Sequence, residues 1–216
     1  MWSDDKHLQD PYNRFIRLLF KLSNGNSLAF CDSRKFGKVT LFETHQLATT
    51  KHLSDIGTDA LDPKLDYQIF KQLLMKRASS LVKSVLLDQT LIAGIGNIYS
   101  DEILWEAGIH PETQVKNIPE VKFKKMFSCM MPILRKGIDF GGDSTSDYRN
   151  IHGRPGAFQG KHRAYRKTGK PCEKRGCAGV IMRRVVGGRS AHFCSAHQLL
   201  TTTRPNVHDV RYGRGS

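Results

Sequence analysis

Apolar residues recur at helical spacing through the middle of the chain, between residues 86 and 111. The positions that follow this spacing are Ile95, Ile98, Ile103, Leu104 and Ala107. Gly94 and Gly96 stand just before the second half of the pattern, where glycine would weaken an ordinary helix. We therefore predict a tight turn at the two glycines, followed by one amphipathic helix over residues 98–107.

The ends of this predicted helix carry residues that commonly begin and end helices. Asn97 stands at the N-cap position, and Gly108 and Pro111 follow the last apolar residue. A glycine turn that opens into a helix N-terminus exposes backbone N–H groups, and these groups together with the Asn97 amide would form a phosphate clamp. From these residues alone, a glycine turn that lets two helices pack closely is the slightly favoured alternative.

Apolar runs near the N-terminus predict short antiparallel strands. Residues 15–22 and 27–31 flank the turn sequence SNGN, a pattern that predicts a hairpin. A further strand is expected over residues 38–42, after the turn sequence DSRKFG at residues 32–37. Because so few strands do not close a core, we expect this region to be part of a sheet.

The rest of the chain alternates between expected helices and loops. The polar residues 50–63 predict a linker, and helical spacing predicts helices over residues 65–76 and 121–135. Residues 141–160 are rich in Gly, Ser and Asp and predict a long loop, a kind of segment that is often functional. Residues 201–216 carry no motif and predict a flexible basic tail.

Four residues have the spacing of metal ligands. Cys172, Cys177, Cys194 and His197 give the pattern C-x4-C-x16-C-x2-H. Two close pairs of such ligands, separated by enough chain for a β-hairpin around Gly187 and Gly188, predict a closed tetrahedral zinc site. A closed site leaves no open coordination position, so we expect one structural Zn²⁺ ion. Three free thiols and a surface histidine are the disfavoured alternative.

The charge of the chain is distributed unevenly. The formal net charge is +14, and residues 121–216 carry 20 Lys and Arg against 5 Asp and Glu, whereas residues 1–120 carry 14 against 15. Such an asymmetry favours a polyanionic partner, and nucleic acid is the natural candidate.

The sequence shows no feature of a membrane or secreted protein. No apolar run is long enough to span a bilayer, and the polar opening MWSDDKHLQD does not resemble a secretory signal. Cys31 and Cys129, the two cysteines outside the metal pattern, are expected to be buried thiols in a reducing compartment. We therefore expect a cytoplasmic, nucleoid-associated protein with no membrane partner.

The string GIGNIYSDEILWEAGIHP, which begins at Gly94, closely resembles the helix-two-turn-helix motif of the formamidopyrimidine-DNA glycosylase and endonuclease VIII family. The resemblance covers roughly residues 11–200 and is strongest at 86–113 and 165–197. In the second region the family usually has four cysteines, C-x2-C and C-x2-C, where this chain has a wider first pair and His197. Zinc accepts both changes.

The resemblance implies an α+β fold in three parts: a partial antiparallel β-sandwich, a helical domain with the helix-two-turn-helix, and a C-terminal zinc ribbon. The expected boundaries are a sandwich remnant at 1–49, a linker at 50–63, the helical domain at 64–140, a lesion-contacting loop at 141–164, the zinc ribbon at 165–200 and the tail at 201–216.

The resemblance also implies which residues contact DNA. Arg34 would approach the orphaned base and Phe36 would wedge between bases where a nucleotide is flipped out. Asn97, Lys83 and Arg189 would grip phosphates beside the lesion. The other expected contacts are Gly94, Gly96 and Tyr165. The alternatives are a core position for Phe36 and a solvated helix lysine at Lys83.

The family's catalytic residues have no match in this sequence. Family members use an N-terminal proline as an imine-forming nucleophile and an adjacent glutamate, whereas this sequence opens with Met1 and Trp2. We therefore assign no catalytic residue and expect the chain to be inactive alone. Three explanations stay open: a fragment or mis-started reading of a full enzyme, which is favoured, a truncated DNA-binding relative, and a module for structured RNA, for which no cluster of stacking aromatic residues is visible.

Taken together, the resemblance implies a monomeric part of a base-excision-repair DNA glycosylase and AP lyase that acts on oxidised purines. Its expected partner is duplex DNA with an oxidised purine or an abasic site.

Overall fold

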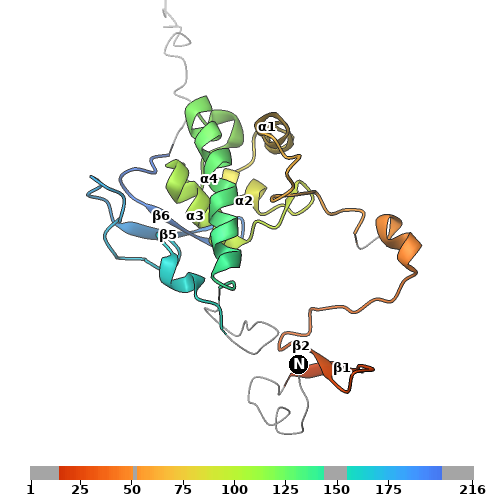
Figure 1. The fold of residues 1–216 in the computed structure, drawn as a ribbon. Coiled ribbons are helices and arrows are strands. Elements are labelled where there is room, and N and C mark those ends of the chain that lie inside the picture. Colours follow the sequence, from red (N-terminus) through yellow and green to blue (C-terminus); the bar gives the residue numbers. More distant parts are fainter. Residues whose placement is uncertain (1–14, 51–52, 144–154, 201–216) are drawn as a thin grey trace, which may run out of the picture. The chain divides into compact units, whose positions relative to one another are not determined.

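The computed structural model describes residues 15–50, 53–143 and 155–200 (Figure 1). The flexible tail predicted at 201–216 and most of the loop predicted at 141–160 lie outside the described residues. The chain divides into two compact units, Met1–Ser54 with Asp139–Gly160 and Asp55–Ile138 with Lys161–Ser216. We refer to them as unit 1 and unit 2. None of the described helices is both long and apolar enough to cross a membrane.

Unit 1 contains the predicted hairpin. Strands β1 (Ile16–Lys21) and β2 (Ser27–Cys31) pair antiparallel, with Leu18 opposite Phe30 and Phe20 opposite Leu28. The turn closes through a hydrogen bond from Leu22 N to Asn26 O at 2.8 Å.

The strand predicted at residues 38–42 is wrong. These residues join no strand in the described part of the chain, and a short 3-10 helix, Thr44–Thr49, follows them. Leu41, in the middle of the segment, is 98% exposed. The apolar alternation is present in the sequence, but a strand forms only where a neighbour accepts its backbone hydrogen bonds.

Unit 2 is built on four helices. They are α1 (Tyr67–Met75), α2 (Val82–Leu86), α3 (Asn97–Ala107) and α4 (Glu120–Asp139). The Asp66 carboxylate caps α1 by accepting a hydrogen bond from Ile69 N at 2.8 Å. A second 3-10 turn, Val115–Asn117, leads into α4. One apolar core joins all four helices, with Phe70, Val85, Leu86, Ile103, Leu104, Phe123 and Met130 among its members.

Part of the predicted linker at 50–63 is structured. Strand β3 (Thr58–Asp59) pairs parallel with β4 (Ile92–Ala93), the strand just before the glycine turn. A Cβ atom on Gly57 would lie 2.5 Å from the backbone carbon of Leu91, so glycine is needed for this close approach. The polar composition of residues 50–63 predicted a linker, but part of this segment packs against the helical domain.

The third part of unit 2 is a β-hairpin with its own small core. Strands β5 (Ile181–Val186) and β6 (Arg189–Cys194) pair antiparallel, with Ile181 opposite Cys194 and Val186 opposite Arg189. A short 3-10 helix, Phe158–Lys161, lies before this region in sequence. The small core consists of Trp105, Ala164, Cys172, Ile181 and Cys194. Because Trp105 belongs to α3, this core also joins the hairpin to the helices.

Helix α3 differs from its prediction in two ways. Its cap residue is Gly96, in extended backbone, so Asn97 is the first helical residue and not the N-cap. The helix is also not simply amphipathic, because every residue from Ser100 to Trp105 is buried. Its polar side faces the β5–β6 hairpin and not solvent. The predicted C-terminus is confirmed: Gly108 has a φ of 67°, and Ile109 N donates to Leu104 O at 3.0 Å.

Candidate metal centre and nucleic-acid interface

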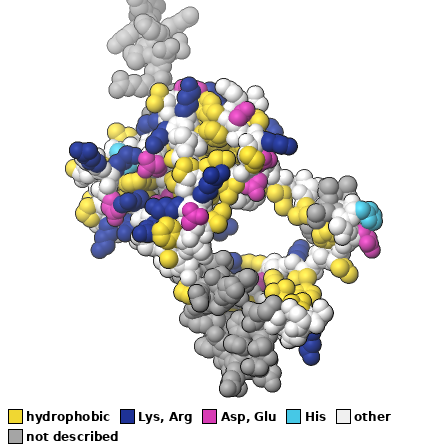
Figure 2. Space-filling view, viewed as in Figure 1, with side chains coloured by type: hydrophobic (Ala, Val, Ile, Leu, Met, Phe, Trp, Pro, Cys, Tyr) yellow, Lys and Arg dark blue, Asp and Glu magenta, His cyan; other side chains and the backbone are white. Residues whose placement is uncertain are grey.

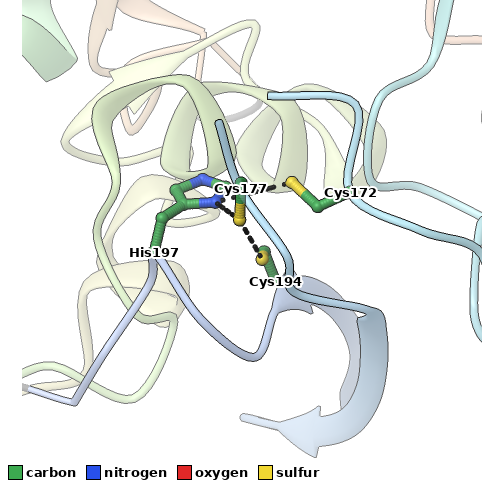
Figure 3. Close-up of side chains that lie close together, drawn as sticks. All are labelled: Cys172, Cys177, Cys194 and His197. Atoms are coloured by element: carbon green, nitrogen blue, oxygen red, sulfur yellow. Dashed lines mark hydrogen bonds between the residues drawn. The ribbon is translucent and has the colours of Figure 1, made fainter. Parts of the chain in front are cut away.

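The four predicted metal ligands lie together at the end of the β5–β6 hairpin, as Figure 3 shows. One ligand atom from each of Cys172, Cys177, Cys194 and His197 lies within 4.8 Å of the other three. The side chains converge from the loop before β5, the end of β6 and the turn after it. The four residues selected from the sequence therefore lie together as a cluster that could hold a metal ion.

The distances between the ligand atoms suit a small tetrahedral ion. Cys177 Sγ lies 3.5 Å from Cys194 Sγ, and His197 Nδ1 lies 3.5 Å from both Cys172 Sγ and Cys177 Sγ. Metal–sulfur bonds of about 2.3 Å and metal–nitrogen bonds of about 2.0 Å give tetrahedral edges of roughly 3.5–3.8 Å. The site can therefore hold one four-coordinate metal ion with no open position.

Hydrogen bonds around the site prepare the ligands for a cation. His197 Nε2 donates to Trp105 O at 3.0 Å, which leaves the Nδ1 lone pair free to point into the site. Burial lowers the pKa of His197, so the ring is held neutral. Trp105 Nε1 donates to Cys172 Sγ at 3.3 Å, and the N–H of Gly179 lowers the pKa of the Cys177 thiol. Helix α3 is thus in direct contact with two of the ligands.

The glycine turn before α3 is closed by a side chain that the sequence analysis missed. Gln89 Oε1 accepts from Gly94 N at 2.9 Å, and Gln89 Nε2 donates to Ile95 O at 3.0 Å. Gly94 has a φ of +96°, a conformation that favours glycine. No local pattern singles out Gln89, because a glutamine five residues before a glycine is common on any surface.

The N-terminus of α3 is open. Its first intrahelical hydrogen bond runs from Ser100 N to Gly96 O at 2.9 Å, so the N–H groups of Asn97 and Ile98 have no partner within the helix. Gly96 is exposed, has a φ of −95°, and a Cβ atom built on it would meet no heavy atom within 4 Å. Neither its conformation nor its packing within the chain requires glycine at this position.

Asn97 lies at this open end with an unused polar atom. Its side-chain Oδ1 is buried and has no hydrogen-bond partner among the described residues. Its backbone oxygen accepts from Ser100 Oγ at 2.9 Å and from Lys83 Nζ at 3.4 Å. The backbone of Asn97 is therefore fixed. The unpaired Oδ1 is a buried acceptor, so a contact with a phosphate oxygen would have to come from the amide nitrogen of this side chain.

The placement of Lys83 argues against the predicted direct contact with DNA. Its side chain is completely buried, and its ammonium group donates to Asp101 Oδ1 at 2.5 Å and to Ser100 Oγ at 3.1 Å. Burial lowers the pKa of Lys83, and the Asp101 carboxylate opposes this effect. A side chain with no exposed surface reaches no phosphate in this conformation. The alternative of a solvated helix lysine is equally wrong.

Arg189 lies at the tip of the β5–β6 hairpin, defined here as residues 187–189. A Cβ atom on Gly187 would lie 2.4 Å from Ser84 Oγ, so the tip packs closely on α2 beside Lys83. Arg189 itself is exposed, and no ion pair engages it within the described ranges. Figure 2 shows Lys and Arg side chains gathered over the region of the β5–β6 hairpin. Helix α2 thus contacts the tip of the hairpin through Ser84 and the open end of α3 through Lys83.

Tyr165 lies beside the same network. It is half-buried, and the edges of the His162 and His192 rings meet its ring at centroid distances of 5.4 and 4.9 Å. The guanidinium of Arg166 lies 5.9 Å from its ring centre. The ring is therefore held by its neighbours and only partly available to a ligand.

In unit 1, the loop after β2 presents Arg34 and Phe36. The Asp32 carboxylate accepts hydrogen bonds from the backbone N–H groups of Arg34, Lys35 and Gly37 at 2.9, 3.0 and 2.6 Å. The Gly37 N–H makes the largest contribution to lowering the pKa of Asp32. Phe36 is 78% exposed, with the Arg34 guanidinium 5.8 Å from its ring centre. The alternative that Phe36 packs in the core is wrong.

The chain is similar to one protein family in sequence and in structure. The model described as the formamidopyrimidine-DNA glycosylase H2TH domain matches residues 56–149. The formamidopyrimidine-DNA glycosylase of Streptococcus thermophilus is 37% identical over 186 residues, which cover 86% of this chain and 67% of that protein. That of Bacillus subtilis is 34% identical over 194 residues, covering 88% and 68%.

Solved structures give the same result. The Lactococcus lactis Fpg in complex with DNA that contains an abasic site has a TM-score of 0.72 at 36% identity, over 80% of this chain and 62% of that chain. MutM in complex with DNA containing carbocyclic 8-oxo-G has a TM-score of 0.70 at 35% identity, over 80% and 61%. The chain therefore spans about two thirds of the length of the curated relatives and somewhat less of the solved chains.

Proposed function

Because the chain belongs to the formamidopyrimidine-DNA glycosylase family, we propose that it binds duplex DNA by its phosphate backbone, in base-excision repair. The binding element is a phosphate clamp with two sides. One side is the open N-terminus of α3 with Asn97, and the other is Arg189 at the tip of the β5–β6 hairpin. A helix N-terminus attracts anions through its free N–H groups, and arginine pairs well with phosphate.

The observation that carries this proposal is the open space at Gly96. Glycine is unnecessary there for the conformation or packing of the chain, yet its lack of a side chain leaves the first N–H groups of α3 accessible. A phosphate can approach those groups only if no side chain stands in the way. The glycine turn therefore supports an external anionic partner better than it supports close packing of two helices.

We extend the proposal to damaged DNA through the loop in unit 1. Phe36 is exposed, and its loop is held by Asp32. It could therefore insert between bases without first being removed from a hydrophobic core, as a wedge residue must. Arg34, beside it, would contact the base opposite the displaced nucleotide. The preferred partner would be a duplex with an abasic site or an oxidised purine, the kinds of DNA present in the related complexes.

We propose that the metal is zinc and that its role is structural. Three thiolates and one imidazole in a closed tetrahedral arrangement are the ligands that zinc prefers. The ion would hold the β5–β6 hairpin together and thereby support Arg189. It would take no part in bond cleavage, because the site has no open position for water or substrate.

Measured affinity for DNA tests the proposed binding. We expect a duplex with an abasic-site analogue to bind with an affinity that falls as salt rises, and Arg189→Ala to reduce the salt slope by about 1. Asn97→Ala should also weaken binding. Arg175→Ala is the matched control, because this exposed arginine lies at the metal end of the same ribbon and not at the tip.

A second measurement concerns cleavage. The 216-residue polypeptide carries no N-terminal proline, so we expect borohydride to trap no covalent adduct with an abasic duplex. A trapped adduct would disprove the expected inactivity. Failure of the wild-type chain to bind any duplex, with the metal bound, would instead overturn the proposed function.

A further inference from the structure

Helix α3 carries two adjacent buried carboxylates that the proposed DNA contacts do not use. Asp101 is 1% exposed and Glu102 is 5% exposed. Burying a carboxylate is unfavourable unless hydrogen bonds or an opposite charge compensate it. Each carboxylate is compensated by different partners. We call Asp101 and Glu102 the acidic pair.

Asp101 joins three elements. Its Oδ1 accepts from Lys83 Nζ on α2 at 2.5 Å. Its Oδ2 accepts from the backbone N–H of His192 on β6 at 2.9 Å, and the His192 ring nitrogen Nδ1 lies at the same distance. A single buried carboxylate thus connects α2, α3 and the β5–β6 hairpin.

Glu102 fixes the segment that leads into the ribbon. Its two carboxylate oxygens accept from the backbone N–H groups of three successive residues, Arg163, Ala164 and Tyr165, at 2.8, 3.0 and 2.9 Å. Three convergent N–H groups form an anion-binding concavity in the backbone. Here the anion is a side chain of the neighbouring helix, so the concavity serves to attach one element to another.

These contacts connect the two sides of the phosphate clamp. Lys83, bound to Asp101, also donates to the backbone oxygen of Asn97. His192, bound to the same carboxylate, is three residues from Arg189 on the same strand. The buried apolar cluster that α3 shares with residues 164–194 is small among the described residues, with five members. A small apolar core specifies the orientation of the hairpin relative to α3 only loosely. We infer that the directional hydrogen bonds of the acidic pair set this orientation.

We propose that Asp101 and Glu102 are positioning residues that hold Arg189 at a fixed distance from Asn97, so that both grip the same duplex. This inference rests on the proposed phosphate clamp. Two contacts reinforce each other only while their spacing matches the ligand. Weakening the hydrogen bonds of the acidic pair should therefore abolish the contribution of Arg189 to DNA affinity, although the arginine itself is still present.

Glu102→Gln is the test variant, because an amide has the same size but faces one of the three N–H groups with its own donor. The matched control is Glu106→Gln on the same helix, where the carboxylate is partly exposed and pairs only with Lys125 among the described ion pairs. Arg189→Ala is added to each background, and affinity for an abasic duplex is measured. Metal content per chain is measured on the same samples.

We expect Arg189→Ala to weaken binding about tenfold or more in the wild-type and Glu106→Gln backgrounds, but less than about twofold in Glu102→Gln with full metal content. An equal loss in all three backgrounds would overturn the inference. If Glu102→Gln lost the metal, the effect of Arg189→Ala would be measured in a Glu102→Asp background. Aspartate keeps the negative charge but is shorter by one methylene group, so it lies farther from the three N–H groups.

A distance measurement separates this inference from the proposed function. Spin labels at Val121→Cys on α4 and Val185→Cys on β5, both exposed positions, report the spread of distances between helices and hairpin in a Cys31→Ser background. We expect a broader distribution in Glu102→Gln than in Glu106→Gln. An unchanged distribution would overturn the positioning role, whereas absence of DNA binding by the wild-type chain would overturn the proposed function.

Discussion

Individual residues in this chain have roles that depend on partners far away in sequence. Lys83 shows this most clearly, because its carboxylate partner, Asp101, lies 18 residues along the chain. The same carboxylate also binds His192, a β-strand residue more than 100 positions from Lys83. From sequence, Lys83 was expected on the surface or on DNA. It instead forms a buried ion pair with Asp101.

Phe36 gives a first prediction at the residue scale. Because its side chain is 78% exposed, Phe36→Ala should change the free energy of unfolding by less than about 0.5 kcal/mol. It should still reduce the preference for an abasic duplex over an undamaged one, since the wedge is lost. Thermal unfolding and competitive binding measure the two effects. Phe70→Ala, at a fully buried position, should cost about 3–5 kcal/mol and serves as the contrast.

Asp32 gives a prediction of pH dependence. Hydrogen bonds from backbone N–H groups lower the pKa of Asp32 in the folded loop, so the loop should be stabilised above the unfolded pKa of this carboxyl group. The stabilisation should be lost only as pH falls through the lower folded pKa. The amide resonance of Gly37 should follow this titration. A Gly37 resonance that does not move with Asp32 would show that the carboxylate does not hold the loop.

At the scale of elements, the zinc ribbon was the part most easily predicted from sequence. Its ligands form two close pairs, and a hairpin between them is a local structure, so spacing alone specified all four residues. The family motif was equally informative, and the comparisons confirm it. Local patterns succeed where the interacting residues are near each other in sequence.

Elements whose environment is set by distant segments were predicted less well. Asp101 and Glu102 suggested a solvent-facing side for α3, but the ribbon covers that side. Residues 38–42 have the alternation of a strand, but pair with none in the described part of the chain. Residues 58–59 were assigned to a linker although they pair with β4. Sequence shows the polarity of a side chain but not what will cover it.

The proposed metal site gives a prediction about how many of the five cysteine thiols react with a thiol reagent. Cys31 is exposed, Cys129 is buried with its pKa raised to about 12, and the other three cysteines lie in the metal site. A thiol reagent should therefore detect one group in the metal-loaded protein, three more after chelation, and the last after unfolding. Four readily reactive thiols before chelation would contradict a closed metal site. His197→Cys should retain the metal, whereas His197→Ala should lose it.

At the scale of the whole molecule, charge and open geometry coincide. The C-terminal part of the chain holds the excess positive charge, 20 basic against 5 acidic residues over 121–216. The tip of the β5–β6 hairpin within it packs on α2, and α2 is joined through Lys83 to the open N-terminus of α3. In the proposed clamp, the charge would attract a polyanion at long range, and the open N–H groups with Arg189 would fix where a phosphate binds. Both features are needed for the proposed clamp.

The most direct test of this account replaces Gly96. Asparagine and aspartate are both favoured N-cap residues, so Gly96→Asn and Gly96→Asp should fold at least as stably as the wild-type chain. The two variants differ by one negative charge at the place where a phosphate should lie. The measurement is the affinity of each for the same abasic duplex at fixed salt. We predict that both variants bind more weakly than the wild-type chain, because each places a side chain where the phosphate should lie, and that Gly96→Asp loses at least about tenfold in affinity. Affinities of both variants equal to that of the wild-type chain would contradict a phosphate clamp at the N-terminus of α3.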